Sequence, residues 1–330
     1  MRRREFVAGL MLPLLARAAW AQQPAKIHRI AVIDPTRAIA DISESNPDYR
    51  VFFQELRALG YIEGGNLIIE RRSGESRPER YAALAQEAVA LHPDVIVSNG
   101  TALAAHLKAA TKTIPIVTNV GDPVAFGLIA SMARPGGNIT GFSIDGGIEA
   151  YGKALEILRS INTSMTKAAL LAHRSQWEGR YARELLDVAQ RLKIEMVRLP
   201  LDGFDESEYR RVIGAFVENG VGGVIVPPMA EFWTSRHVFV DLLNRARLVA
   251  IYPYDDYARI GGLIAYSPDL EQMVRLSVRY VDRILNGANP AEMPFLQPTK
   301  FLTVINLKTA RALGVEMPPS LLVRADEVIE

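Results

Sequence analysis

Short apolar runs alternate with segments of helical periodicity along most of the chain. Residues 95–97 and 114–117 are apolar and β-branched without alternation, a pattern typical of parallel strands covered by helices on both faces. Residues 49–59 instead place their apolar side chains on one helical face, and Gly60 follows as a stop signal. The order β-α-β-α-β-α-β in this half predicts a doubly wound parallel sheet.

The same pattern restarts after residue 143. Strands at 223–226 and 248–251 each end in a polar or aromatic loop, in the order seen in the first half. We therefore predict an α/β protein with two doubly wound parallel-sheet lobes, although chance repetition of βα units is an alternative. The predicted lobe 1 is 22–142 with a return segment at about 267–298. The predicted lobe 2 is 143–266 with a C-terminal segment at about 299–330, and the pattern does not decide to which lobe that segment belongs. The segments that cross between the lobes form a multi-strand hinge.

Ligands in open parallel sheets bind at the carboxyl ends of the strands, where this chain carries hydroxyls, amides, carboxylates and aromatic rings. In lobe 1 the candidate ligand residues are Asp34, Ser98, Asn99, Gly100, Thr101, Gly121, Asp122 and Ser143. In lobe 2 they are Arg174, Gln176, Trp177, Pro228, Met229, Tyr254, Asp255 and Tyr266.

Asp122 has two interpretations. Its charge, next to a glycine at a buried strand end, needs a partner, and a ligand amino group would serve. It would equally serve as the N-cap of a helix beginning at Val124. Asp255 and Asp256 are adjacent and should point in opposite directions, one to a ligand and one to water.

The first 21 residues predict an export signal. Three arginines precede an apolar stretch at 6–15, and Ala19-Trp20-Ala21 is a cleavage signal, so we expect cleavage after Ala21. The paired arginines favour twin-arginine export over the general secretory route. The apolar stretch is shorter than the roughly 20 residues that span a bilayer. We expect a periplasmic protein.

Composition and motifs exclude several functions. The chain has 330 residues, a net charge of +1 and no cysteine, which argues against a large nucleic-acid surface and excludes disulfides and thiolate metal sites. The five histidines are dispersed, so no metal is expected. There is no P-loop, and residues 141–145 lack the final glycine of a G-x-S-x-G elbow. We expect no cofactor and no enzymatic activity.

Several segments together resemble the type I periplasmic substrate-binding proteins of ABC transporters, in the family that includes the tryptophan and tyrosine binders. The matching segments are 53–64 with Asn66, 77–80, 93–97, 121–123, 133–141, 297–301, 304–310 and 319–322. The resemblance implies a monomer that closes on a small organic solute, an amino acid or an aromatic or other carboxylate. It also implies delivery to a permease and an ATPase.

The resemblance also implies roles for single positions. Residues 98–101 and Gly121-Asp122 would be the ligand loops of lobe 1, with Asp122 the partner of a ligand amine. The loop after Ala172, where the family often has Asn-Pro, here reads His173-Arg174-Ser175-Gln176-Trp177. Arg174 or Trp177 would suit an aromatic carboxylate. The alternatives are a ligand-sensing subunit for a membrane receptor and, less favoured, an enzyme on the same fold.

Overall fold

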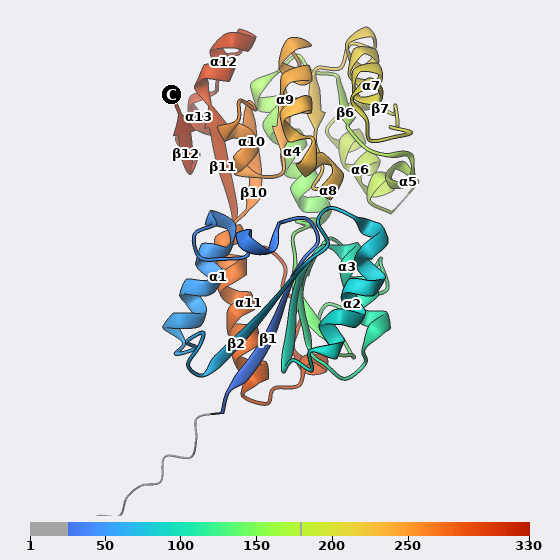
Figure 1. The fold of residues 1–330 in the computed structure, drawn as a ribbon. Coiled ribbons are helices and arrows are strands. Elements are labelled where there is room, and N and C mark those ends of the chain that lie inside the picture. The colour runs from blue at the N-terminus through green and yellow to red at the C-terminus, as the bar shows by residue number, and fades with distance from the viewer. Residues whose placement is uncertain (1–25, 179) are drawn as a thin grey trace, which may run out of the picture.

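The computed structural model describes residues 26–178 and 180–330 and has two lobes (Figure 1). The predicted export signal, including its cleavage site, lies outside the described residues. The two-lobed α/β fold with parallel sheets is confirmed.

Lobe 1 is built on a five-stranded sheet in the order β2-β1-β3-β4-β5, with every neighbouring pair parallel. Its strands are β1 (His28–Asp34), β2 (Leu67–Ser73), β3 (Val95–Asn99), β4 (Ile116–Val120) and β5 (Ile139–Ser143). Its helices are η1 (Ile39–Asp41), α1 (Pro47–Ala58), η2 (Pro78–Arg80), α2 (Tyr81–Ala90), α3 (Thr101–Ala110), α11 (Leu270–Leu285) and η3 (Pro290–Glu292).

Alternation along β1 shows why this sheet is buried on both faces. Ile30 and Val32 pack in a cluster with residues of α1 and α11, whereas Ala31 and Ile33 pack with residues of α2 and α3. Successive strand side chains point to opposite faces, so a wholly apolar strand needs helices on both. Helix α11 lies in sequence between strands of the second sheet but covers the first sheet, where it packs beside α1 (Figure 1).

Lobe 2 has a seven-stranded sheet in the order β12-β11-β10-β9-β8-β6-β7. Its strands are β6 (Lys167–Leu170), β7 (Glu195–Val197), β8 (Gly223–Ile225), β9 (Ala250–Tyr252), β10 (Ile264–Pro268), β11 (Phe301–Asn306) and β12 (Glu327–Ile329). Its helices are α4 (Gly147–Ile161), α5 (Arg174–Trp177), α6 (Arg180–Arg191), α7 (Glu206–Glu218), α8 (Ala230–Thr234), α9 (Arg236–Arg245), α10 (Asp255–Arg259), α12 (Leu307–Leu313) and α13 (Pro319–Leu322).

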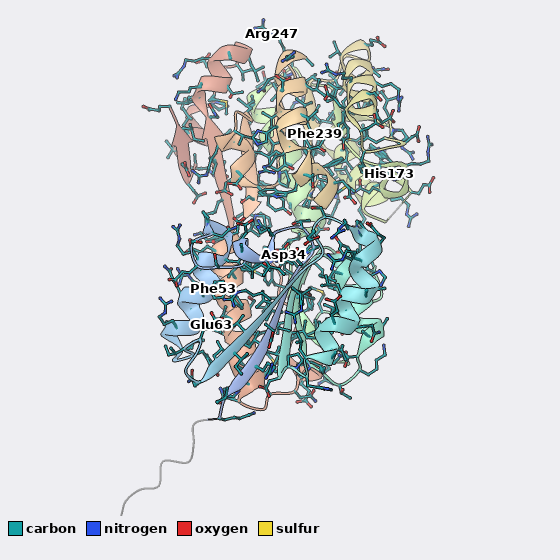
Figure 2. All side chains as sticks on the ribbon, viewed as in Figure 1. Asp34, Phe53, Glu63, His173, Phe239 and Arg247 are labelled. Carbon is teal, nitrogen blue, oxygen red and sulfur yellow. The ribbon has the colours of Figure 1, made fainter. Side chains whose placement is uncertain are left out.

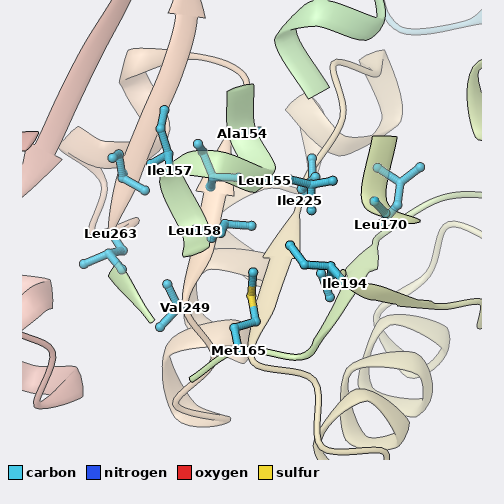
Figure 3. Close-up of a cluster of buried hydrophobic side chains, with 14 of the residues drawn as sticks. Ala154, Leu155, Ile157, Leu158, Met165, Leu170, Ile194, Ile225, Val249 and Leu263 are labelled. Atoms are coloured by element: carbon cyan, nitrogen blue, oxygen red, sulfur yellow. The ribbon is translucent and has the colours of Figure 1, made fainter. Parts of the chain in front are cut away.

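This second sheet is not wholly parallel. Strand β11 runs antiparallel to β10 because the chain re-enters lobe 2 from lobe 1 after α11. Strand β12 then adds in parallel at the edge, so the C-terminal segment belongs to this sheet. Under α4, the buried side chains of Leu155, Leu158 and Ile225 join Met165 and Val249 in one continuous core (Figure 3).

Three chain segments cross between the lobes: 143–147, 268–270 and 296–301. The third is hydrogen-bonded to the other two. The Ser143 amide donates to the Leu296 carbonyl over 2.8 Å, and the Asp269 amide donates to the Lys300 carbonyl over 3.1 Å. The hinge is therefore one hydrogen-bonded ribbon with the third crossing in the middle.

The prediction of a helix beginning at Val124 is wrong. The amides of Leu128 and Ile129 both donate to the Pro123 carbonyl, and the segment forms turns. Gly127 adopts a left-handed φ of 63°, a conformation that interrupts a right-handed helix.

Candidate functional site

The carboxyl ends of the two sheets face each other across the space between the lobes (Figure 1). On lobe 1 these ends are Asp34, Asn99 and Val120. The electrostatics agree with this arrangement. The pKa of Asp256 in lobe 2 is raised by burial first, then by Asp255, and then by Asp48 of lobe 1. The strand ends predicted to hold a ligand are thus brought together.

Asp34 is the organising residue of the lobe 1 wall, at the upper end of its sheet (Figure 2). Its side chain is fully buried. Its carboxylate accepts hydrogen bonds from the Tyr49 hydroxyl at 2.6 Å, the Asn99 amide nitrogen at 3.2 Å, and the backbone amides of Thr36 and Arg37 at 2.8 and 2.7 Å. Burial alone would raise the pKa of Asp34, but the hydrogen bonds from Arg37, Tyr49 and Thr36 lower it. Asp34 therefore positions Asn99 and the adjoining loop.

The other polar residues of this wall join neighbouring strand ends. The Ser98 hydroxyl donates to Thr118 Oγ1 at 3.0 Å, and the Ser143 hydroxyl donates to the Gly121 carbonyl at 2.8 Å. Thr101 Oγ1 accepts from the Gly121 amide at 3.2 Å. Gly100, with φ of 86°, makes the turn into α3. The structure gives most of these loop side chains hydrogen-bond partners within the lobe, and their role as ligand contacts stays a prediction.

Asp122 follows the end of β4 and holds the next turn. Its Oδ1 accepts from the amides of Val124 and Ala125, both at 3.0 Å. The capping interpretation is thus realised on a turn rather than on a helix.

In lobe 2 the residues predicted after Ala172 are held by the lobe itself. The Arg174 guanidinium pairs with Asp202 at 2.6 Å on the exposed surface. Gln176 Oε1 accepts from the His173 amide at 3.0 Å. Trp177 is buried in the hydrophobic core under α4, only 5% exposed. The pattern of residues could not distinguish this core tryptophan from a cleft one.

Tyr254 and Asp255 lie at the start of α10. Tyr254 is buried, and its ring meets Trp233 edge-on with centroids 5.5 Å apart. Burial first, with a contribution from Asp145, raises the pKa of its hydroxyl. The Asp255 carboxylate pairs with Arg259 at 3.1 Å. Met229 is partly buried against the aromatic core beneath.

A pocket of about 440 Å³, including space open to solvent, lies beside the hinge. Pro228 and Tyr266, two of the candidate ligand residues, line it. Its walls also include Tyr151 and Phe301, which were not predicted. Asp145 is its one charged residue among those described.

Tyr266 and Phe301 stack in this pocket with ring centroids 4.9 Å apart and an interplanar angle of 15°. They come from β10 and β11, whose antiparallel pairing places Pro268 opposite Phe301. The sequence signal for this contact was the return of the chain at residue 300, but the pairing register was needed to identify the stacked partner. The pocket is mainly apolar and aromatic, and suits a planar or apolar group.

Among residues 26–178 and 180–330, no group of three or more histidine, aspartate or glutamate side chains is arranged to hold a metal ion. Within the same part of the chain, no helix is long and apolar enough to cross a membrane.

Two sheet lobes with facing carboxyl edges, three crossings and a pocket at the hinge define the class of the periplasmic binding proteins. The model of the family described as "ABC transporter substrate binding protein" matches residues 47–329. The chain belongs to this family of substrate-binding proteins.

Individual relatives agree with this assignment. A tyrosine-binding protein of Clostridioides difficile (strain R20291) is 24% identical over 267 residues, which are 80% of this chain and 76% of the relative. A Streptococcus pneumonia ABC domain solved in complex with L-Trp has a TM-score of 0.80 at 21% identity, covering 92% of this chain and 99% of that one. A ligand-free, open substrate-binding protein with adhesive properties from Clostridium difficile has a TM-score of 0.72 at 20% identity, with the same coverage.

Proposed function

We propose that this chain is the solute-binding component of an ABC importer. It captures an amino acid or an aromatic or other carboxylate between its lobes and delivers it to a permease and an ATPase. The observation that carries the proposal is the pocket beside the hinge, at the strand ends of lobe 2, in a chain of this family. The names of the tyrosine-binding relative and of the L-Trp complex support this ligand class.

The two walls suggest which part of the solute each lobe binds. The aromatic pocket of lobe 2 takes its apolar part. The lobe 1 wall offers the N-terminal amides of α3 and the carboxylate of Asp122 to its polar head. Because these contacts come from both lobes, they form fully only in a closed state, and the solute shifts the protein toward it.

Export fits this role. We propose that residues 1–21 direct the chain to the periplasm and are removed after Ala21. Mass spectrometry of the protein from a periplasmic extract would then give a mature chain that begins at Gln22. A chain that keeps its first residues would contradict this part of the proposal.

The test of solute binding is a thermal shift of the protein from Gln22 onward with a panel of amino acids, aromatic acids and dicarboxylates. Ligand at 100 times its dissociation constant stabilises the folded state by about 2.7 kcal/mol, which gives a clear shift. No shift with any member of the panel would show that the proposed ligand class is wrong. Native mass spectrometry of the protein as isolated identifies a ligand retained from the cell.

A further inference from the structure

The hinge and the pocket share residues. The first crossing contributes Ile144, Asp145 and Gly146 to the pocket wall, the second contributes Pro268, and the third contributes Phe301. Because the third crossing is hydrogen-bonded to both others, a group that enters the pocket touches the ribbon on which the lobes turn. Filling of the pocket and the angle between the lobes are therefore mechanically linked.

Gly146 leaves room for the Phe301 ring beside this ribbon. A Cβ built on Gly146 would lie 2.4 Å from Phe301 Cζ and 2.6 Å from Ala150 Cβ. The backbone at Gly146 has φ of −73°, which any residue adopts, so the glycine is needed for space rather than for conformation. The edge of the Phe301 ring, at Cζ and Cε1, thus lies against Gly146, while one face of the ring stacks on Tyr266.

The remaining pocket chemistry selects a ring. Tyr151 and Pro228 add further ring faces, and the aliphatic side chains of Ile144 and Ile251 complete the wall. Aromatic side chains gain most from planar partners that stack or meet them edge-on. A charged head would lose its hydration in such a wall, so it belongs toward lobe 1.

Building on the proposed function, we propose that Phe301, seated on Gly146, is a specificity-determining residue. With Tyr266 it forms a subsite for the planar aromatic ring of the solute, and that subsite is part of the hinge. The ring of the solute extends the Tyr266–Phe301 stack and stabilises the ribbon in the closed arrangement. The chain consequently prefers solutes with an aromatic ring to aliphatic solutes with the same head group.

The test is titration calorimetry with L-phenylalanine, L-tryptophan, indole-3-acetate and L-leucine. Phe301→Leu should weaken binding of the aromatic probes about tenfold and change the affinity for L-leucine little, which narrows the preference for rings. Phe301→Tyr should restore the preference for aromatic solutes. The matched control is Phe204→Leu, an exposed aromatic of lobe 2 that stacks on His173 and does not line the pocket, and it should change nothing. Circular dichroism checks that each variant is folded.

The outcomes separate the two proposals. Equal aromatic affinities in the wild type and in a folded Phe301→Leu variant would overturn the role of Phe301. Binding of aliphatic members alone by the wild type would overturn the ring subsite and leave the solute-binding function standing. If the wild type binds no member of the wider panel, the proposed ligand class and the ring subsite both fail.

Discussion

The facing strand ends of the two lobes differ in what their side chains already do before a ligand arrives. On lobe 1, Asp34, Ser98 and Ser143 are buried and hydrogen-bonded to groups of their own lobe. On lobe 2, the pocket is lined by rings and aliphatic groups, whose packing leaves space. Buried polar groups must find partners during folding, whereas an apolar surface can remain open until a ligand covers it. Polar strand-end residues are therefore weaker predictors of ligand contact than they look.

The largest expected effect comes from a substitution at Asp34, which removes a hydrogen-bond acceptor from the lobe 1 wall. Asp34→Asn places an amide NH₂ among donors that need an acceptor, so we expect a loss of about 3 kcal/mol in the free energy of unfolding in urea. The control is Asp41→Asn, an exposed carboxylate on η1, which should be neutral. An equally small effect of both variants would contradict the organising role of Asp34.

The pH dependence of this effect has a defined sign. The folded state lowers the pKa of Asp34 from its ordinary value of 3.8, so its stabilisation is complete above that value and is lost as the pH falls through the lower folded-state pKa. The stability gap between wild type and Asp34→Asn should therefore stay constant from neutral pH to about 4 and narrow only below that. A gap that closes above pH 5 would contradict this.

Gly146→Ala tests the lobe 2 side of the comparison at the hinge. The added Cβ overlaps the Phe301 ring, so the ribbon must shift, and overpacking of this kind costs about 2 kcal/mol. We expect the melting temperature and the affinity for every solute to fall. Gly137→Ala is the matched control, since a Cβ there meets nothing within 4 Å. Unchanged affinity in Gly146→Ala would show that the pocket and the hinge are independent.

Asp122 can be tested for its two roles separately. Asp122→Asn keeps an oxygen that accepts from Val124 and Ala125 but removes the charge, whereas Asp122→Ala removes both. Loss of the cap should cost about 1 kcal/mol of stability in the alanine variant only. If Asp122 pairs with a ligand amine, both variants weaken binding of an amino acid but not of indole-3-acetate. Full affinity of the asparagine variant for amino acids would leave Asp122 with the cap alone.

The smallest expected effect concerns Asp256 at the facing edge of lobe 2. Burial, Asp255 and Asp48 raise its pKa, so its charged form destabilises the folded state at neutral pH. Asp256→Asn should therefore raise stability at pH 7 by about 0.5 kcal/mol, with the gain fading as the pH falls and the wild-type carboxyl takes up its proton. Asp255→Asn, which instead loses the ion pair with Arg259, should bring no gain.

The sequence could predict the frame of the site because strand ends follow from local pattern. The runs at 95–97 and 223–226 are apolar on both faces, which predicts buried strands there. Asn99 and Pro228 follow these runs and therefore lie at the strand ends that face the other lobe. It could not place Trp177, since core and cleft tryptophans have the same local pattern. Nor could it find the contact of Gly146 with Phe301, which depends on how three distant crossings pair.

The central claim is that a solute is captured by closure of the two lobes on the hinge pocket. The chain contains no cysteine, so Glu87→Cys on α2 and Arg210→Cys on α7, both exposed, allow two spin labels to be attached at defined places in the two lobes. Double electron–electron resonance then measures the distance between them with and without the tightest-binding aromatic probe. We predict that the probe shifts the distance distribution to a shorter, narrower one, and that Gly146→Ala reduces the shift. Saturable binding with an unchanged distance distribution would contradict capture by closure.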